Sequence, residues 1–464
     1  MLKNPDAQKH VPSFKEKMEK ENLPPVLIDN FIYYYNKVIS GEKGIIYDKD
    51  IECVRENEID DAKDLSEYTG AGKKAIRNSI RIVLNGGLGT SMGLSRAKSL
   101  IEVRNGKTFL DIIVRQAGKS NIKLAFMNSF NTHEDTVAAL KKMNLSSFPI
   151  LFLQHKFPKI LREGFAPAIW PENNELEWNP PGHGDIYTAL HTSGILNKLL
   201  SEGIEYAFIS NSDNLGATMD EAILGYFAEI GYPFLMEVAE RTPSDLKGGH
   251  LARHKNGRLL LREAAQCPVN ELDAFKDTSC YRFFNTNNIW LNLCYLKDLI
   301  EKEGTVHLPL ILNPKNMDPR DDNSPRIYHI ETAMGAAISL FDGATAVRVS
   351  RSRFFPVKKC NDLLALRSDC YLVTEEENLI INPERKYKTL RINLDPDYYG
   401  KIDQFNERFK EGAISLIECE SLTVIGDVYF EKDVKITGNV VITNRGRSRA
   451  VIKKGSVIDG DINF

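Results

Sequence analysis

A cluster of glycines followed by a lysine is the first feature of the sequence that could carry out chemistry. Gly86, Gly87, Gly89 and Gly93 fall within eight residues, and Lys98 comes five residues after the last of them. Because glycine has no Cβ, such a loop lets backbone N–H groups converge on an anion, and a phosphate chain is the usual occupant. These residues predict a phosphate-binding loop with a lysine to meet the charge. A solvated glycine-rich turn without a ligand is the alternative.

Neither of the two common phosphate loops explains this spacing. The Walker pattern G-x-x-x-x-G-K-[ST] requires a lysine directly after its second glycine, but Gly93 is followed by Leu94. The dinucleotide pattern G-x-G-x-x-G requires a third glycine where Met92 stands. Both patterns are excluded by spacing.

The loop as a whole resembles a known nucleotide-binding segment. L-N-G-G-L-G-T-S-M-G at residues 84–93, followed by the lysine and by T-F-L-D at residues 108–111, is similar to the nucleotide loop of eukaryotic-type UTP–glucose-1-phosphate uridylyltransferases. Most members of that family have Gly-Pro before the lysine, whereas Arg96-Ala97 stand here. The resemblance implies that Lys98 is catalytic and that it binds the nucleotide together with Leu84, Asn85, Gly86 and Gly87.

Two motifs further along the chain resemble nucleotide and sugar-phosphate contacts of the same family. Gln154 follows the apolar run 151–153, and its carboxamide offers both a donor and an acceptor to the edge of uracil. His183 lies on a constrained turn in P-P-G-H-G-D at residues 180–185. The resemblance implies that Gln154 and Gly182 bind the uridine and that His183 meets the sugar phosphate. Without it, both side chains would be interpreted as solvated loop residues.

An aspartate at the end of another apolar run is the candidate metal ligand. Residues 206–209 lead into S-N-S-D-N-L-G, in which Asp213 stands after Asn211 and Ser212. Magnesium prefers oxygen ligands and joins a carboxylate to phosphate oxygens, although a helix cap or Asx-turn is the commoner use of such an aspartate. The resemblance implies that Asp213 binds Mg²⁺, that Asn211 lies near the sugar or phosphate, and that Ser212 belongs to the nucleotide site.

A set of glycines, amides and one carboxylate resembles the sugar side of the family's site. Recognition of a hexose requires a carboxylate and amides around its hydroxyl groups. The motif that begins at Lys247 and two later segments supply these groups as Gly248, Gly249, Glu263, Asn285 and Asn287. Alone, each of these residues would be interpreted as a loop or cap residue. His250 and His254 are four residues apart, but no third ligand is evident, so we expect no zinc site.

A basic segment provides a second candidate catalytic lysine. Residues 349–359 read V-S-R-S-R-F-F-P-V-K-K, a pattern that is usually a solvated basic surface. The segment and the D-L-L at residues 362–364 resemble the family's R-x-R-F-x-P-V-K motif. The resemblance implies that Lys358 reaches the phosphates.

Composition limits the class of protein. The chain has 464 residues, of which 42% are hydrophobic, and its net charge of −3 arises from mixed signs without a long basic run. We therefore expect a folded protein that binds neither nucleic acid nor membranes. Seven cysteines without a C-x-x-C pair favour unpaired thiols in a reducing compartment over a disulfide framework or zinc cage. With no apolar leader or long apolar segment, the expected location is the cytoplasm.

The elements that must position these motifs fall into three predicted domains. Residues 1–79 form a mainly helical N-terminal module, with helices expected over residues 13–22 and 26–39. Residues 80–389 alternate short apolar runs with helical stretches, which predicts an α/β catalytic domain. The resemblance implies a Rossmann-like, mixed-sheet nucleotidyltransferase core of the GT-A-like type. Ligands of such sheets lie at the carboxyl edge of the strands, where these motifs stand.

Residues 390–464 differ from the preceding domain in their hydrophobic pattern, because apolar residues repeat every six positions. One ladder is Leu416, Leu422, Val428, Val434 and Val440, and a second is Val424, Phe430, Ile436 and Ile442. A hexapeptide period is typical of a parallel β-helix, with a β-meander as the alternative. A β-helix at the end of the chain favours a homo-oligomer.

Taken with the resemblance, these motifs predict that the protein forms UDP-glucose and pyrophosphate from UTP and glucose 1-phosphate. A phosphate oxygen of the sugar would attack the α-phosphorus in line, while Mg²⁺ on Asp213 and the ammonium groups of Lys98 and Lys358 neutralise charge. One alternative is a broader UDP-sugar or UDP-N-acetylhexosamine pyrophosphorylase. Another is a non-catalytic protein that binds nucleotide sugars.

Overall fold

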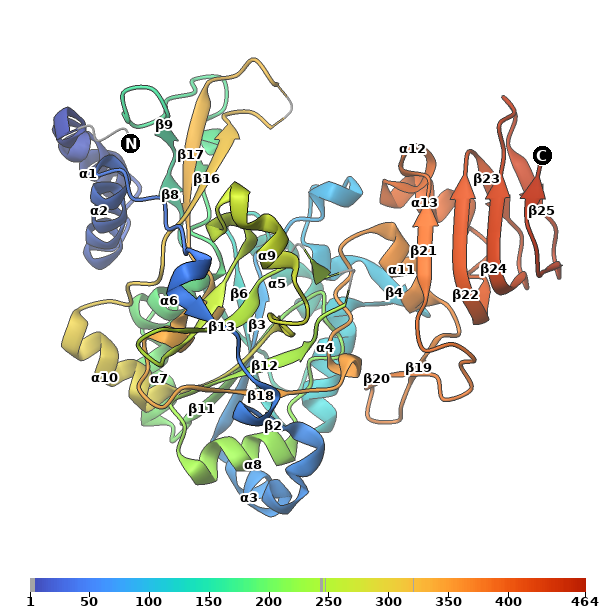
Figure 1. Cartoon of the computed structure of the whole chain (residues 1–464), viewed down its shortest axis with the longest axis horizontal. Coiled ribbons are helices and arrows are strands. Elements are labelled where there is room, and N and C mark those ends of the chain that lie inside the picture. Colours follow the sequence, from blue (N-terminus) through green and yellow to red (C-terminus); the bar gives the residue numbers. More distant parts are fainter. Residues whose placement is uncertain (1–4, 243–244, 247, 320) are drawn as a thin grey trace.

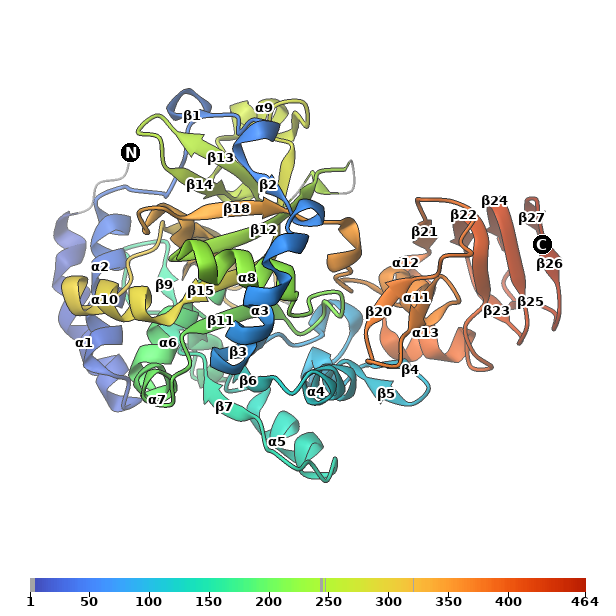
Figure 2. The same ribbon diagram turned by 90° about the horizontal axis from the view of Figure 1, so that it is seen from below.

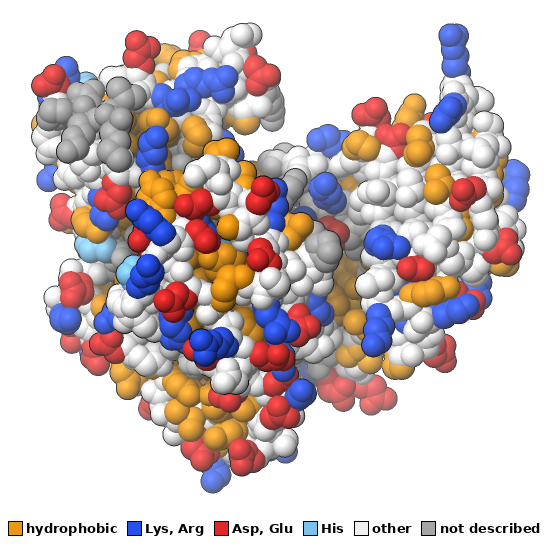
Figure 3. Space-filling model, in the orientation of Figure 1, with side chains coloured by type: hydrophobic (Ala, Val, Ile, Leu, Met, Phe, Trp, Pro, Cys, Tyr) orange, Lys and Arg blue, Asp and Glu red, His pale blue; other side chains and the backbone are white. Residues whose placement is uncertain are grey.

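The computed structural model describes residues 5–242, 245–246, 248–319 and 321–464. A large sheet forms the centre of the main body, and a smaller set of strands stands apart at the C-terminal end (Figure 1). Seen from below in Figure 2, helices α11, α12 and α13 lie between these two parts, and the N-terminal helices lie at the opposite end of the molecule. Acidic and basic side chains are interspersed over the face shown in Figure 3, and a deep notch separates the main body from the C-terminal strands.

The central sheet is mixed, as predicted. Strand β15 runs antiparallel to both β11 and β12, whereas β11, β3, β6 and β7 are parallel neighbours. The main path runs in the order β2 (Asp60–Asp61), β18 (Thr345–Arg348), β12 (Phe234–Glu240), β15 (Phe283–Asn292), β11 (Tyr206–Asn211), β3 (Ser79–Asn85), β6 (Lys123–Asn128) and β7 (Ile150–Leu153). Strands β1 (Ile51–Glu52), β13 (His250–His254) and β14 (Leu259–Arg262) join it beside β15.

Helices cover both faces of this sheet. Successive side chains of a strand point to opposite faces, so Ile82 enters the core under α6, α7 and α10, whereas Val83 enters the core under α4. Helices α3 and α8 cover the same face as α4. The helices of the main body are α3 (Thr69–Ala75), α4 (Phe109–Lys119), α5 (His133–Lys141), α6 (Ile186–Thr192), α7 (Ile195–Ser201), α8 (Glu221–Ile230), α9 (Leu272–Lys276), α10 (Leu293–Glu303) and α11 (Cys360–Arg367).

The T-F-L-D segment is the start of helix α4. The Thr108 hydroxyl accepts the amide of Asp111 at 3.2 Å, and the Asp111 carboxylate accepts the amide of Thr108 at 2.8 Å. This reciprocal capping box satisfies two amides that would otherwise lack partners at the helix N-terminus. It therefore fixes where the chain after the glycine loop enters the core.

Two helices at the N-terminus pack on the main body through aromatic side chains. Helices α1 (Val11–Lys20) and α2 (Pro25–Ile39) agree with the predicted ranges, and Pro25 occupies the first turn of α2, where its missing N–H has no cost. Phe14, Phe31 and Tyr35 pack together, and Phe31 contacts Phe157 at a centroid distance of 5.2 Å. The same N-terminal 79 residues also contribute β1 and β2 to the central sheet.

Several short strands form small sheets around the centre. These are β8 (Phe157–Pro158) with β10 (Trp178–Asn179), β9 (Ile160–Leu161) with β17 (Arg326–Glu331) and β16 (Ile311–Asn316), β4 (Glu102–Arg104) with β5 (Lys107–Thr108), and β19 (Tyr371–Val373) with β20 (Leu379–Ile381). Strand β17 leads directly into Thr332 and Met334, which contact the functional site.

The C-terminal strands pair in parallel. One sheet contains β21 (Arg391–Leu394), β22 (Ser415–Ile425), β24 (Lys435–Thr443), β26 (Val457–Ile458) and β27 (Ile462–Asn463), and a second contains β23 (Val428–Phe430) and β25 (Ala450–Ile452). Leu422 lies opposite Val440 and Val424 opposite Ile442, an offset of 18 residues or three hexapeptides. All nine residues of the two predicted ladders are at most 1% exposed. Helices α12 (Pro396–Tyr399) and α13 (Ile402–Arg408) precede β22.

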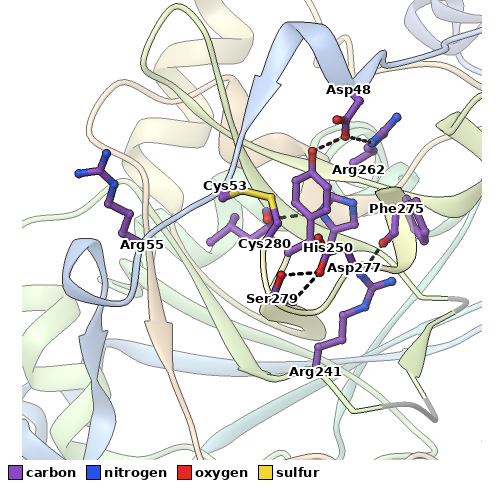
Figure 4. The surroundings of a disulfide bond; sticks show 12 residues. Asp48, Cys53, Arg55, Arg241, His250, Arg262, Phe275, Asp277, Ser279 and Cys280 are labelled. Carbon is purple, nitrogen blue, oxygen red and sulfur yellow. Dashed lines mark hydrogen bonds and ion pairs between the residues drawn. A yellow bond between two sulfur atoms is a disulfide. The ribbon is translucent and has the colours of Figure 1, made fainter. Parts of the chain in front are cut away.

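The cysteine prediction was wrong for one pair. Cys53 and Cys280 form a disulfide with a Cα–Cα distance of 5.2 Å (Figure 4), whereas the other five cysteines among the described residues carry free thiols. The two residues are 227 positions apart and meet because β1 pairs with β13, which itself joins β15 close to the turn that carries Cys280. Local spacing cannot reveal such a pairing because it depends on the tertiary fold. Within the described residues, every helix is too short or too polar to span a lipid bilayer.

Candidate active site

A cavity of about 350 Å³ lies at the carboxyl edge of β3 and β11. The pairing of Asn211 with Leu84 aligns the ends of these two strands, so the loops that follow them face the same space. Most residues predicted for the nucleotide site line this cavity, namely Leu84, Gly86, Gly87, Lys98, Gln154, Gly182, Asn211, Ser212 and Asp213. His183, which was predicted for the sugar phosphate, lines it as well.

The glycine loop doubles back on itself and so returns Lys98 to its start. The amide of Lys98 donates to the carbonyl of Gly87 at 3.1 Å, and Leu88 forms an antiparallel bridge with Ala97. The amide of Gly89 also donates to the carbonyl of Arg96 at 3.4 Å, so Arg96 and Ala97 both take part in the hairpin-like path that closes the loop. The geometry places the lysine at the mouth of the glycine segment rather than away from it.

A buried polar network beneath the loop holds it in place. The Asn85 side chain, which is completely buried, donates to Asn128 at 2.8 Å and to Thr136 at 2.9 Å. The Thr132 hydroxyl donates to the carbonyl of Asn85 at 2.8 Å, and the Ser129 hydroxyl donates to that of Gly86 at 2.9 Å. Asn85 thus points away from the cavity and anchors the loop. Sequence reasoning missed its partners, although N-S-x-x-T directly after an apolar run was an available signal.

Lys98 and Asp213 meet in the cavity. The ammonium nitrogen lies 2.6 Å from a carboxylate oxygen of Asp213, and the two side chains are 15% and 17% exposed. The two residues come from different strand ends and are 115 positions apart. This pair brings the glycine loop and the S-N-S-D segment together in one cavity.

Gln154 is held in one orientation by the neighbouring P-P-G-H-G-D loop. Its Nε2 group donates to the carbonyl of Gly182 at 2.8 Å, and its Oε1 atom lies so close to Gly86 that a Cβ there would be 2.6 Å away. Asp185 reinforces this arrangement, because it accepts the amide of His155 at 2.7 Å and contacts the His155 ring at 2.9 Å. The glutamine oxygen and the second N–H of its NH₂ group therefore remain for further hydrogen bonds.

His183 is fixed as a neutral hydrogen-bond donor. The amide of Met334 donates to its Nδ1 atom at 2.9 Å, so the proton of the neutral ring resides on Nε2. Burial lowers the pKa of His183 from 6.5 to about 4. The side chain lines the cavity, and near neutral pH it offers an uncharged N–H rather than a positive charge.

This pKa shift predicts a pH dependence of stability. The folded-state pKa of His183 lies below that of the unfolded chain, so its contribution is complete above about pH 6.5 and is lost as the pH falls towards 4. We expect His183→Gln to remove a pH-dependent term of up to about 3 kcal/mol from the free energy of unfolding. Urea unfolding of both proteins at pH 7.5 and pH 5 measures this term. An equal loss of stability in both proteins on acidification would contradict it.

Lys358 lies in a neighbouring cavity of about 430 Å³, together with Gly248. The carboxylate of Asp362 accepts the amides of Lys358 and Lys359 at 2.7 and 2.8 Å. Burial raises the pKa of Asp362, while these amides and the charges of Lys98 and Lys358 act in the opposite direction. One carboxylate thus lies within the electrostatic influence of both lysines. The two predicted lysines therefore flank adjacent cavities rather than a single one.

The predicted sugar-side residues form one cluster next to Lys358. A Cβ on Gly249 would lie 2.7 Å from the Glu263 carboxylate, and the amide of Asn285 donates to the carbonyl of Gly249 at 3.1 Å. The Asn285 side chain donates to that of Asn287 at 2.9 Å. Burial raises the pKa of Glu263, against the opposing charge of Lys358. Lys247 lies outside the described residues. His250 is buried on strand β13 and stacks on Tyr281, so it is a core residue.

Comparison with known proteins agrees with this geometry. The sequence model of the UTP–glucose-1-phosphate uridylyltransferase family matches residues 28–437. The enzyme of that name from Solanum tuberosum is 40% identical over 446 residues, covering 93% of this chain and 92% of that protein. The Saccharomyces cerevisiae enzyme is 41% identical over 384 residues, covering 81% and 76% of the two chains.

Solved structures resemble the whole chain. A mutant of UDP-glucose pyrophosphorylase from Leishmania major, in complex with UDP-glucose, has a TM-score of 0.90 and 39% identity, covering 98% of this chain and 99% of that one. A UDP-glucose phosphorylase from Trypanosoma brucei has a TM-score of 0.89 and 42% identity, covering 98% and 100%. The chain therefore belongs to the UTP–glucose-1-phosphate uridylyltransferase family.

Proposed function

We propose that this protein forms UDP-glucose and pyrophosphate from UTP and glucose 1-phosphate. The observation that carries the proposal is the convergence of Lys98, Asp213 and the glycine loop on one cavity that Gln154 and His183 also line. The names of the relatives support the same reaction. A phosphate oxygen of the sugar forms a bond to the α-phosphorus of UTP, and the bond to the β-phosphate breaks to release pyrophosphate.

Recognition of uracil is assigned to Gln154 and Gly182. The bond from Nε2 to the Gly182 carbonyl fixes the carboxamide of Gln154, and its oxygen accepts a hydrogen bond from the base. Uracil offers an N3–H donor, whereas the N3 atom of cytosine is an acceptor, so this oxygen favours UTP over CTP. The preference depends on the loop that holds the amide in place.

Binding of the phosphates is assigned to the amides of the glycine loop, to two lysines and to two uncharged hydrogen-bond donors. Two anions must approach each other in this reaction, so the barrier is mainly electrostatic and positional. Lys98 and Lys358 neutralise charge on the triphosphate, while the neutral Nε2–H of His183 and the amide of Asn211 orient the sugar phosphate. The cluster of Gly248, Gly249, Glu263, Asn285 and Asn287 is assigned to the hexose hydroxyl groups.

A divalent cation fits this site only together with a nucleotide. Asp213 supplies one carboxylate to the cavity, and within the described part of the chain no group of three or more His, Cys, Asp or Glu side chains could hold a metal. Magnesium typically binds one or two carboxylates and completes its shell with substrate phosphates and water. When bound, Mg²⁺ would neutralise charge on the triphosphate, and Asp213 is the residue proposed to hold it.

A panel of sugar phosphates tests the proposal. With UTP and Mg²⁺, we expect pyrophosphate release with glucose 1-phosphate to exceed that with galactose 1-phosphate or N-acetylglucosamine 1-phosphate by about tenfold or more, because misplaced hydroxyl groups leave polar groups unpaired. Removal of the metal with EDTA is expected to abolish the reaction, and added Mg²⁺ to restore it.

The same panel separates the alternatives. Comparable rates with all three sugars would favour a broad UDP-sugar pyrophosphorylase. Binding of UDP-glucose, measured by calorimetry, without pyrophosphate release from any sugar would favour a non-catalytic binding protein. Full activity in EDTA would remove the role proposed for the metal.

We also infer that the C-terminal strands form a parallel β-helix. The 18-residue offset between β22 and β24 and the parallel pairing of β23 with β25 support one turn per three hexapeptides. Val457 and Phe464, near the end of the chain, are 66% and 53% exposed, which supports self-association through this end.

A further inference from the structure

Residues 353–359, called here the Lys358 segment, lie directly against residues 213–216, which begin with Asp213. The amide of Val357 donates to the carbonyl of Asp213 at 3.2 Å, and Asn214 forms an antiparallel bridge with Pro356. We propose that Asn214 is a positioning residue that fixes Lys358 relative to Asp213. The inference rests on the catalytic role proposed for Lys358.

The Asn214 side chain makes two opposite hydrogen bonds to the Lys358 segment. Its Nδ2 group donates to the carbonyl of Arg353 at 3.0 Å, and its Oδ1 atom accepts the amide of Phe355 at 2.8 Å. The residue is 2% exposed. Pro356 has no N–H, so a regular strand pairing cannot continue through it, and the carboxamide of Asn214 binds the backbone groups of Arg353 and Phe355 that precede it. Only a side chain with both a donor and an acceptor serves both groups.

A second contact shows how closely the two segments approach. A Cβ on Gly216, two residues after Asn214, would lie 2.7 Å from the Ser352 carbonyl oxygen. Any larger residue would therefore separate the segments. Two residues of the D-N-L-G sequence therefore allow the two segments to lie close together. Gly216 leaves room for the Ser352 carbonyl, and Asn214 binds the Lys358 segment through two hydrogen bonds.

Both ends of the Lys358 segment are anchored. At its beginning, the Arg353 guanidinium donates to the completely buried Glu237 carboxylate at 2.8 and 2.6 Å. At its end, Asp362 accepts the amides of Lys358 and Lys359. Asn214 holds the middle, next to Asp213. The anchors at the ends restrain where the segment enters and leaves, and Asn214 sets its distance from the nucleotide cavity.

This placement predicts an effect on turnover more than on binding. Asn214 is not among the residues that line the nucleotide cavity, so its loss leaves the contacts to uridine in place. The loss of Asn214 does, however, allow Lys358 to shift relative to Asp213. A shift of about 1 Å in a group that neutralises the transition state can cost about 10²-fold in rate.

A matched pair of variants tests the proposal. Asn214→Ala is expected to lower kcat by a factor between about 10 and 10², with the KM for UTP changed less than about threefold. The control is Asn444→Ala in the C-terminal strands. Asn444 is 6% exposed, donates to the carbonyls of Asp427 and Ser448 at 2.7 and 2.9 Å, and accepts the amide of Gly446 at 2.9 Å. Asn444→Ala is expected to lower the Tm by about as much as Asn214→Ala does, while its kcat stays normal.

A double-mutant cycle with Lys358→Ala identifies the residue through which Asn214 acts. If Asn214 works by placing Lys358, Asn214→Ala causes no further loss of kcat once Lys358 is alanine. A normal kcat in Asn214→Ala, or the same fold-loss in both backgrounds, would overturn the inference and leave the role of Lys358 intact. A normal kcat in Lys358→Ala would instead overturn the proposed function of that lysine, and the inference with it.

Discussion

Replacing Lys98 by alanine is expected to lower kcat by about 10²-fold or more, with the fold intact. The lysine lies at the mouth of the glycine loop, 2.6 Å from Asp213, and its side chain is 15% exposed. A charge held in such an enclosed site is worth more than a charge in water, and it requires no reorganisation during the reaction. Steady-state rates of pyrophosphate release, together with thermal unfolding, measure the two parts of this prediction.

Lys107→Ala is the matched control for Lys98→Ala. Lys107 lies on the short strand that follows the same loop, and it pairs with Glu377 at 2.8 Å outside the nucleotide cavity. We expect this variant to keep its turnover, because a partly exposed ion pair contributes little. A near-normal rate in Lys98→Ala, or an equal loss in Lys107→Ala, would argue against a specific role for Lys98.

Gly182→Ala is expected to lower kcat/KM for UTP by about 10²-fold. Gly182 has a φ of +81°, and a Cβ at this position would lie 2.3 Å from the backbone oxygen of Thr332. An alanine therefore adds the cost of a left-handed conformation and displaces the loop that orients Gln154 and His183. Kinetics with varied UTP, and calorimetry with UDP-glucose, measure the loss of binding and of turnover separately.

Gly194→Ala is the control that separates the effect of the steric clash with Thr332 from the effect of the left-handed backbone conformation. Gly194 has a φ of +75°, and a Cβ there would meet no atom within 4 Å. Both alanine variants bear the same conformational cost, but only Gly182→Ala moves the site. The expectation fails if both variants lower kcat/KM to the same extent, since a general loss of stability would then explain the effect.

Contiguous motifs at strand ends were predictable because their geometry is local. Gly86 and Gly87 follow a β-branched run, and Asp213 follows another apolar run, so parallel strands bring them to one edge of the sheet. The same logic applied to Gln154, which follows an apolar run, whereas the role of Gly182 was implied only by the resemblance of P-P-G-H-G-D to the family motif. The meeting of Lys98 with Asp213 could be anticipated from family resemblance, although the doubled-back path of the loop could not.

Residues that act through tertiary contacts escaped the sequence argument. Thr132 and Thr136, at the start of helix α5, hold Asn85. The N-S-x-x-T pattern marks a polar turn after an apolar run, but it does not show that a loop 47 to 51 positions away is its partner. Asn214 lies inside a recognised motif, but its proposed positioning role depends on hydrogen bonds to residues 139 to 141 positions later in the chain. Strands β1 and β2 contain two residues each, so no hydrophobic period could reveal that they join the central sheet.

The disulfide between Cys53 and Cys280 closes a covalent ring in the chain. Gly86, Lys98, Gln154, His183 and Asp213 all belong to that ring, whereas Lys358 lies beyond it. A single break of the backbone inside the ring leaves all of these groups in one covalent molecule. A break between Cys280 and Lys358 divides the two proposed catalytic lysines between separate pieces, which only non-covalent packing then holds together.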